Sequence, residues 1–197
     1  MAKTHIAITG GIGSGKSLVL QFLREWNYPV FSCDELYKQV ILSPEYIEKI
    51  EKLFPSTIND GKIDRKILSE IVFNNEENLK QLNALAHPLI MDLLMKNMKA
   101  TECELAFAEV PLLFEGNFEK LFDKVVYIAR DKNERIDAIL KRDGISQAAA
   151  EKRILNQFDG MSEEGQLRLK NCNANIITND GSIEGLKSKI LQLLNKS

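Results

Sequence analysis

The stretch Thr9-Gly10-Gly11-Ile12-Gly13-Ser14-Gly15-Lys16-Ser17 decides the fold of this chain. It follows the strand-like run His5–Ile8 and leads into residues 16–25, where apolar residues recur at helical spacing. Gly10-x-x-x-x-Gly15-Lys16-Ser17 matches every fixed position of the Walker A pattern, which joins a strand to a helix. Because all fixed positions occur in that context, the sequence predicts a phosphate-binding loop rather than a glycine-rich turn that binds nothing.

Each residue type in this loop has a physical task. Glycines adopt backbone conformations that other residues avoid, and they let amide N–H groups approach phosphate oxygens. The N-terminus of the following helix adds the positive end of its dipole. We expect the Lys16 ammonium to reach the β- and γ-phosphates, the Ser17 hydroxyl to bind Mg²⁺, and the Leu18 amide to face the α-phosphate. The predicted ligand is a nucleoside triphosphate with magnesium, and its predicted contacts are Gly11, Ile12, Gly13, Ser14, Gly15, Lys16, Ser17 and Leu18.

Length and composition indicate a soluble globular protein. The chain has 197 residues, of which 44% are hydrophobic and 27% charged, so it fits one domain or one core with an insertion. A net charge of −2 argues against binding to nucleic acid or to an anionic membrane. Cys33, Cys103 and Cys172 are too scattered for a CxxC pair, and they suit a reducing cytosol. With no signal-peptide pattern and no long apolar run, we expect a cytoplasmic protein, and no obligate protein partner is evident.

Short apolar segments alternate with helical patterns along most of the chain. Several segments, such as Val125–Ile128, are continuously apolar, which is typical of strands covered on both faces of a parallel sheet. The predicted strands are Thr4–Thr9, Pro29–Phe31, Leu105–Val110, Lys124–Ala129 and Asn175–Thr178. The predicted core helices are 16–25, 132–142 and 182–194. This alternation predicts an α/β fold with a five-stranded parallel sheet flanked by helices.

Two segments depart from the alternation. Residues 34–103 have an almost wholly helical pattern, which predicts a helical insertion that caps a ligand; an extra packing layer is the alternative. Residues 142–170 are polar and punctuated by glycine, and they predict either a mobile helical lid or an exposed helix pair. The nucleotide core would then comprise residues 1–33, 104–141 and 171–197.

Two classes of protein bind a triphosphate with such a loop: kinases, and switch or motor nucleotidases. A GTPase would show an [NT]KxD segment, and this chain has none. The run Leu105–Glu109 approaches the acidic strand end of a motor ATPase, where Glu109 would orient water or magnesium, but the chain is short for such an assembly. A small-molecule kinase is therefore favoured.

A kinase needs an acceptor for the proton of the receiving hydroxyl. The second predicted strand ends at Ser32-Cys33-Asp34, and strand ends meet at the crevice beside the phosphate loop. Asp34 is therefore the candidate base. Its alternative role is the N-cap of a helix over residues 35–41.

Taken together, these residues resemble the dephospho-coenzyme A kinase family, a family of P-loop kinases. The resemblance covers nearly the whole chain in order. Its two most specific segments are Leu82–Ile90 (LNALAHPLI) and Glu109–Glu115 (EVPLLFE). The other matching segments are Thr9–Ser17, the PVFSCDELYKQV segment, Asp60–Leu68, Lys141–Asp143, Arg153-Ile154-x-x-Gln157 and Ile176–Gly181.

The resemblance implies transfer of the ATP γ-phosphate to the ribose 3′-hydroxyl of dephospho-coenzyme A. It implies three parts, namely a nucleotide core, a helical acceptor domain and a lid. By resemblance, Asp34 is the general base, Lys16 the phosphate lysine and Arg142 the lid arginine that neutralises charge during transfer. The positions that the resemblance assigns to the acceptor are Thr9, Asp34, Arg65, His87, Pro111 and Leu112, and the position that it assigns to the adenine of ATP is Asn179.

Some alternatives stay open at this point. Arg65 could be a surface charge, and His87 could be structural. Leu18 stands where many members have Thr, and Ser32-Cys33-Asp34 stands where many have Asp-Ala-Asp, so one carboxylate is absent. A P-loop kinase for another nucleotide or small alcohol, or a non-kinase ATPase, remains the alternative function.

Overall fold

A computed structural model describes residues 3–195 of the chain. The residues fall into two compact units. One comprises the chain up to Val30 and from Ala100 onward, and the other comprises Phe31–Lys99. Each unit is described separately below.

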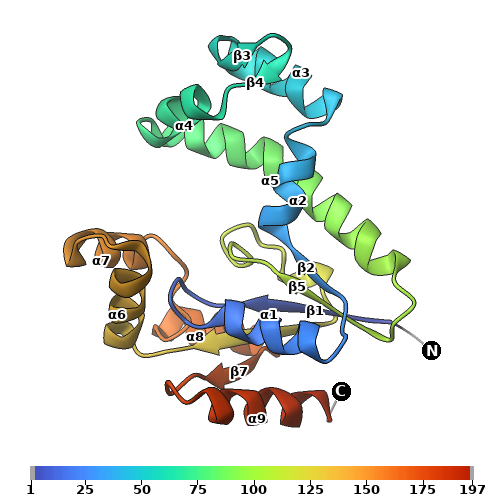
Figure 1. Cartoon of the computed structure of the whole chain (residues 1–197), viewed down its shortest axis with the longest axis vertical. Helices are drawn as coiled ribbons and strands as arrows, with labels where there is room; N and C mark the ends of the chain where they lie inside the picture. Colours follow the sequence, from blue (N-terminus) through green and yellow to red (C-terminus); the bar gives the residue numbers. More distant parts are fainter. Residues whose placement is uncertain (1–2, 196–197) are drawn as a thin grey trace. The chain divides into compact units, whose positions relative to one another are not determined.

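The first unit is built on the predicted parallel sheet (Figure 1). The strands of the sheet are β1 (Thr4–Thr9), β2 (Val30–Ser32), β5 (Leu105–Glu109), β6 (Lys124–Ala129) and β7 (Asn175–Thr178). The boundary between the two units falls within β2, after Val30. The strands lie in the order β2-β5-β1-β6-β7, so β1 has a parallel neighbour on each side. The loop that follows β1 therefore leaves the middle of the sheet, at the edge where the carboxyl ends of parallel strands form a ligand crevice.

One face of this sheet packs against α1 (Lys16–Glu25) and α9 (Ile183–Leu194). Successive strand residues point to opposite faces, so Ile6 and Ile8 of β1 face these helices. The buried cluster comprises Ile6, Ile8, Val19, Leu20, Phe22, Leu23, Phe107, Val126, Ile128, Ile177, Leu186 and Ile190. Burial of the apolar face of α1 fixes the position of its first residue, Lys16.

Aromatic side chains gather around Tyr127, which β6 contributes. The rings of Phe114 and Phe158 stack with centroids 4.1 Å apart, and the Tyr127 ring meets Phe158 edge-on at 6.0 Å. The Gly160 N–H donates to the Tyr127 hydroxyl at 3.1 Å. Burial raises the pKa of this hydroxyl. The helix that follows, α8 (Glu163–Asn171), buries Leu169.

Helices α6 (Lys132–Asp143) and α7 (Gln147–Leu155) form a hairpin after β6. The Asp131 carboxylate caps α6, accepting from the N–H groups of Asn133 and Glu134 at 2.8 and 3.3 Å. The turn between the helices begins at Gly144, whose φ of 64° is left-handed. The hairpin buries Ile136, Ile139, Ala150 and Ile154, with Ile12, Leu140 and Ile145 packed against them.

The second unit is mainly helical. Its helices are α2 (Cys33–Val40), α3 (Pro44–Leu53), α4 (Arg65–Phe73) and α5 (Glu76–Ala100), together with the 3₁₀ turn η1 (Pro55–Thr57). One feature differs from the expected helical pattern: a small hairpin, β3 (Ile58–Asn59) and β4 (Lys62–Ile63), interrupts the helices. Helix α5 contains Pro88. No helix within residues 3–195 is both long and apolar enough to span a membrane.

Candidate active site

The loop between β1 and α1 has the conformation that the Walker A pattern requires. Gly15 precedes the first residue of α1 with a left-handed φ of 101°. A Cβ atom at Gly15 would lie 2.4 Å from Nδ2 of Asn179. Both the backbone angle and the close approach require glycine at this position.

The Lys16 side chain contacts the first residues of the loop. Its Nζ donates to the carbonyl oxygens of Gly10 at 2.7 Å and Gly11 at 3.2 Å. The Ser14 N–H donates to the Gly11 carbonyl at 3.2 Å, which closes the loop on itself. Ser17 is exposed in the first turn of α1. The loop therefore combines an ammonium that contacts its backbone with the N-terminus of a helix, which is a favourable position for a phosphate.

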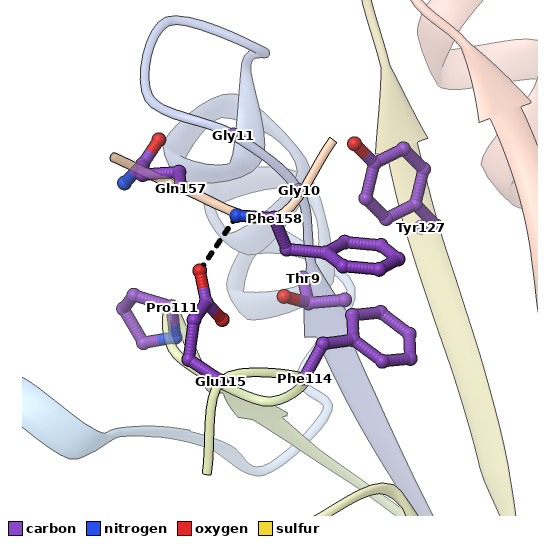
Figure 2. A pocket seen from close by; sticks show the side chains of 9 residues that line it. All are labelled: Thr9, Gly10, Gly11, Pro111, Phe114, Glu115, Tyr127, Gln157 and Phe158. Carbon is purple, nitrogen blue, oxygen red and sulfur yellow. Dashed lines mark hydrogen bonds between the residues drawn. The ribbon is translucent and has the colours of Figure 1, made fainter. Parts of the chain in front are cut away.

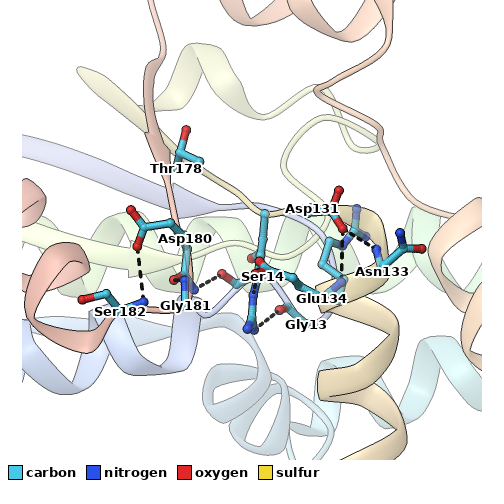
Figure 3. Close-up of polar contacts among 12 residues, drawn as sticks. Gly13, Ser14, Asp131, Asn133, Glu134, Thr178, Asp180, Gly181 and Ser182 are labelled. Carbon is cyan, nitrogen blue, oxygen red and sulfur yellow. Dashed lines mark hydrogen bonds and ion pairs between the residues drawn. The ribbon is translucent and has the colours of Figure 1, made fainter.

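Asn179, which directly follows β7, contacts the phosphate loop at Ser14. Figure 3 shows Ser14 and the segment that follows β7. Asn179 is 6% exposed, and its Nδ2 donates to the Ser14 carbonyl at 2.9 Å. Its backbone N–H donates to the Ala129 carbonyl at 2.8 Å, and its Oδ1 accepts from the Gly181 N–H at 3.0 Å. The structure therefore places Asn179 next to the phosphate loop, and the expected contact with adenine stays a prediction.

Three further side chains contact the loop; Gln157 belongs to a segment that carries the family resemblance, whereas Arg130 and Arg135 were not candidate site residues. Nη1 of Arg130 donates to the Gly13 carbonyl at 3.1 Å, and Nε of Arg135 donates to the Ile12 carbonyl at 2.9 Å. Oε1 of Gln157 accepts from the Ile12 N–H at 2.7 Å. Arg130 was detectable, because it follows β6 at the sheet edge where strand ends converge. Arg135 is near the beginning of α6, where no local pattern marks it.

A small pocket adjoins the loop within the first unit (Figure 2). Its lining comprises Thr9, Gly10, Gly11, Pro111, Phe114, Glu115, Tyr127, Gln157 and Phe158. Oε1 of Glu115 accepts from the Phe158 N–H at 2.8 Å, which joins the loop after β5 to the segment between α7 and α8. Of the residues that the resemblance assigns to the acceptor, Thr9 and Pro111 line this pocket, whereas Leu112 is exposed and is not part of its lining.

Arg142, the expected lid arginine, is the penultimate residue of α6. Its Nε and Nη2 donate to the two carboxylate oxygens of Asp143 at 2.6 and 3.0 Å, and Nη1 of Arg153 contacts the same carboxylate at 2.6 Å. Hydrogen bonding to Arg142 lowers the pKa of Asp143, and the same bonds raise the pKa of Arg142. The Arg142 side chain is 59% exposed, so the pair lies at the surface of the helical hairpin.

The remaining predicted residues belong to the second unit. Asp34 is exposed in the first turn of α2, and the N-cap of this helix is Ser32. The alternative role of Asp34 as an N-cap is therefore wrong, because the helix starts before it. Arg65 is the exposed first residue of α4, and His87 is half-buried in α5. Their contacts with an acceptor stay predictions.

A Walker A loop at the central strand of a five-stranded parallel sheet defines a P-loop nucleotide-binding protein. Solved kinases share this fold: shikimate kinase from Acinetobacter baumannii aligns with a TM-score of 0.57 at 18% identity, over 98% of this chain and 94% of that one. The sequence pattern of the family described as dephospho-CoA kinase matches residues 4–185. The chain belongs to the dephospho-CoA kinase family.

Individual relatives agree with this assignment. A dephospho-CoA kinase of Thermus thermophilus is 35% identical over 96% of this chain and 89% of its own length. One from Fusobacterium nucleatum is 35% identical over 94% of both chains. Among solved structures, TT1252 from Thermus thermophilus aligns with a TM-score of 0.80 at 34% identity, over 100% of this chain and 98% of that one. Dephospho-CoA kinase from Campylobacter jejuni aligns with a TM-score of 0.63 at 26% identity, over 98% of this chain and 97% of that one.

Proposed function

We propose that this protein transfers the γ-phosphate of ATP to the ribose 3′-hydroxyl of dephospho-coenzyme A, giving coenzyme A and ADP. This is the last step of coenzyme A biosynthesis. The observation that carries the proposal is a complete phosphate loop whose backbone is hydrogen-bonded by Asn179, Arg130 and Arg135, in a chain that matches the family over residues 4–185.

The loop supplies the nucleotide half of the site. Its backbone N–H groups and the N-terminus of α1 bind the phosphates, and Lys16 adds a mobile positive charge. Mg²⁺ would be bound by the Ser17 hydroxyl together with phosphate oxygens, and Ser17 fits this role because it is exposed in the first turn of α1. When bound, the ion neutralises charge on the phosphates during transfer.

The acceptor half of the site rests on the second unit. In our proposal Asp34 accepts the proton of the 3′-hydroxyl, while Arg65 and His87 contact the acceptor. A carboxylate is suited to this role, since it aligns the hydroxyl and takes its proton as the bond to phosphorus forms. The helical unit around residues 34–103 would then be the acceptor-binding domain.

The α6–α7 hairpin and the segment after it, residues 142–170, act as the lid in this proposal. Arg142 would leave Asp143 and approach the phosphoryl group in transit. The protein would act in the cytoplasm, and we expect it to need neither an obligate protein partner nor a membrane.

One experiment tests the acceptor directly. The purified protein is offered ATP and Mg²⁺ with dephospho-coenzyme A, AMP or shikimate in parallel, and ADP and the phosphorylated product are measured. We expect rapid product formation with dephospho-coenzyme A alone, its 3′ position confirmed by ³¹P NMR, and loss of turnover with excess EDTA. Phosphorylation of AMP or shikimate instead would favour another P-loop kinase, and ADP release that no acceptor stimulates would favour an ATPase.

A further inference from the structure

Arg135 brings a buried positive charge to the phosphate loop. Arg135 is 7% exposed, and its Nε donates to the Ile12 carbonyl at 2.9 Å. A Cβ atom at Gly11 would lie 2.1 Å from Nη2 and 3.1 Å from Nη1 of this arginine. The guanidinium therefore lies directly against the Gly11–Ile12 part of the loop.

One of the two terminal nitrogens of this guanidinium, Nη2, is a hydrogen-bond donor without an acceptor among the described residues. Nη2 of Arg135 is buried, and no residue in the part of the chain that the structure describes accepts a hydrogen bond from it. Buried polar groups are nearly always hydrogen-bonded, and leaving one unpaired costs about 1–3 kcal/mol, more for a charged group. A buried donor of this kind, beside a loop built for phosphate, indicates a ligand that supplies the acceptor.

The charge of Arg135 also lacks a carboxylate partner. Arg130 pairs with Glu134 and Arg142 with Asp143, at 3.3 and 2.6 Å. Within residues 3–195, by contrast, Arg135 forms no ion pair. An isolated buried charge is costly, so such cations are paired or bind an anion. Since the adjoining loop is a phosphate loop, the anion that fits is a phosphate group of the nucleotide.

We propose that Arg135 is a second cation of the triphosphate site. Its Nε keeps the Ile12 carbonyl, and its Nη2 donates to an oxygen of the terminal phosphate of bound ATP. This inference rests on the proposed function, because it requires a nucleoside triphosphate in the loop. Nucleotides that lack the terminal phosphate gain little from this contact. Arg135 therefore discriminates ATP from ADP and favours product release.

The test compares ATP and ADP affinity in variants of the full-length protein. Arg135→Lys keeps the charge but has no second nitrogen to share between the loop and phosphate, and Arg135→Ala removes both. The matched control is Arg24→Gln, which removes one positive charge from the exposed last turn of α1. The measurements are calorimetric dissociation constants for Mg·ATP and Mg·ADP, single-turnover rates with dephospho-coenzyme A, and melting temperatures.

We expect Arg135→Ala to weaken Mg·ATP binding at least tenfold more than Mg·ADP binding, and to lower the single-turnover rate by about 10²-fold, as for other donors to developing charge. Arg135→Lys should lie between the wild type and Arg135→Ala, and millimolar guanidinium should partly restore the rate of Arg135→Ala. Arg24→Gln should match the wild type. If Arg135→Ala does not fold, the ATP-to-ADP affinity ratio of Arg135→Lys decides.

Two outcomes overturn the inference while leaving the proposed function intact. One is an unchanged ATP-to-ADP ratio in both Arg135 variants. The other is an equal loss of ATP and ADP affinity with a lowered melting temperature, because Arg135 then only supports the loop. Failure of the wild type to phosphorylate dephospho-coenzyme A would count against the proposed function instead, since that measurement is made without any variant.

Discussion

The amide nitrogen of the Asn179 side chain lies 2.9 Å from the carbonyl oxygen of Ser14, although 165 residues separate the two along the chain. This contact joins the end of β7 to the phosphate loop. The same nitrogen would lie only 2.4 Å from a Cβ atom at Gly15. The shape of the loop therefore depends on the end of β7 as well as on its own glycines. Figure 3 shows Ser14 of the loop together with Asp180 and Gly181 of the segment that follows β7.

Asn179→Asp should weaken the loop without changing the size of the side chain. The introduced carboxylate cannot donate to the Ser14 carbonyl and leaves it unpaired, which costs about 1–3 kcal/mol of unfolding free energy. Affinity for ATP and GTP should fall by the same factor if the loop contact dominates. Chemical denaturation and calorimetry with both nucleotides check this. If stability is kept and only the preference for ATP over GTP is lost, Asn179 reads adenine, as the family resemblance implies.

Gly11→Ala should reproduce the effect of losing Arg135. The added methyl would meet Nη2 of Arg135 at 2.1 Å, so the guanidinium must move away from the loop. We expect a rate loss of about 10²-fold in Gly11→Ala, and little further loss when Arg135→Ala is added, because both changes remove the same donor. Single-turnover rates of the two single variants and the double variant form the cycle. Fully multiplicative losses would show that the two residues act independently.

The sheet could be predicted because its strands carry strong local signals. Thr4–Thr9, Lys124–Ala129 and Asn175–Thr178 have the predicted bounds, since short apolar runs end at clear turn residues. The hairpin β3–β4 was missed because strands of two residues are too short for any periodicity. Its turn, Asp60-Gly61, has positive φ at both residues. Helix α5 continues through Pro88, because the surrounding helical residues outweigh one lost hydrogen bond.

The phosphate loop could be predicted from sequence because the residues expected to bind phosphate are consecutive in the chain. The contacts of Arg135 and Gln157 with Ile12 could not, since 123 and 145 residues separate the partners. Such contacts depend on how β6 and the α6–α7 hairpin are placed beside β1, which no local pattern specifies. The N-cap of α2 was also misplaced, because the helix begins at Cys33 and not after Asp34.

Lys16→Ala should abolish most of the activity. The Lys16 ammonium donates hydrogen bonds to the Gly10 and Gly11 carbonyls. When ATP binds, the ammonium can exchange these bonds for bonds to phosphate oxygens. Loss of this charge should lower the rate of phosphoryl transfer by roughly 10³-fold, as for comparable phosphate clamps. Circular dichroism controls for folding, and steady-state assays measure the rate. Near-normal turnover in the folded variant would contradict a catalytic phosphate loop.

Arg142→Ala should lower kcat more than it raises the KM for ATP. The guanidinium is paired with Asp143 at the surface of the hairpin, and in our proposal it leaves this pair when residues 142–170 close as a lid. Its charge matters most when the phosphoryl group is in transit. Arg153→Ala is the matched control, because it removes the other cation from the same carboxylate. An unchanged kcat with a raised KM would identify Arg142 as a contact of bound ATP and would contradict a lid that acts on the transition state.

Asp34→Asn tests the proposed base at constant shape. Since Asp34 lies inside the first turn of α2 and Ser32 is the N-cap, the substitution removes only a favourable interaction with the helix dipole, about 0.3–1 kcal/mol. The melting temperature should therefore change little. The rate of dephospho-coenzyme A phosphorylation should fall by about 10²–10⁴-fold, the usual contribution of a general base, while both substrates still bind.

Glu35→Gln is the control for Asp34→Asn, because it removes a neighbouring carboxylate from the same exposed helical turn. It should keep both stability and rate. An Asp34→Asn variant that remains active, or one whose rate falls only in proportion to its melting temperature, would remove Asp34 from the reaction and leave the phosphate loop as the part of the site that still carries the kinase assignment.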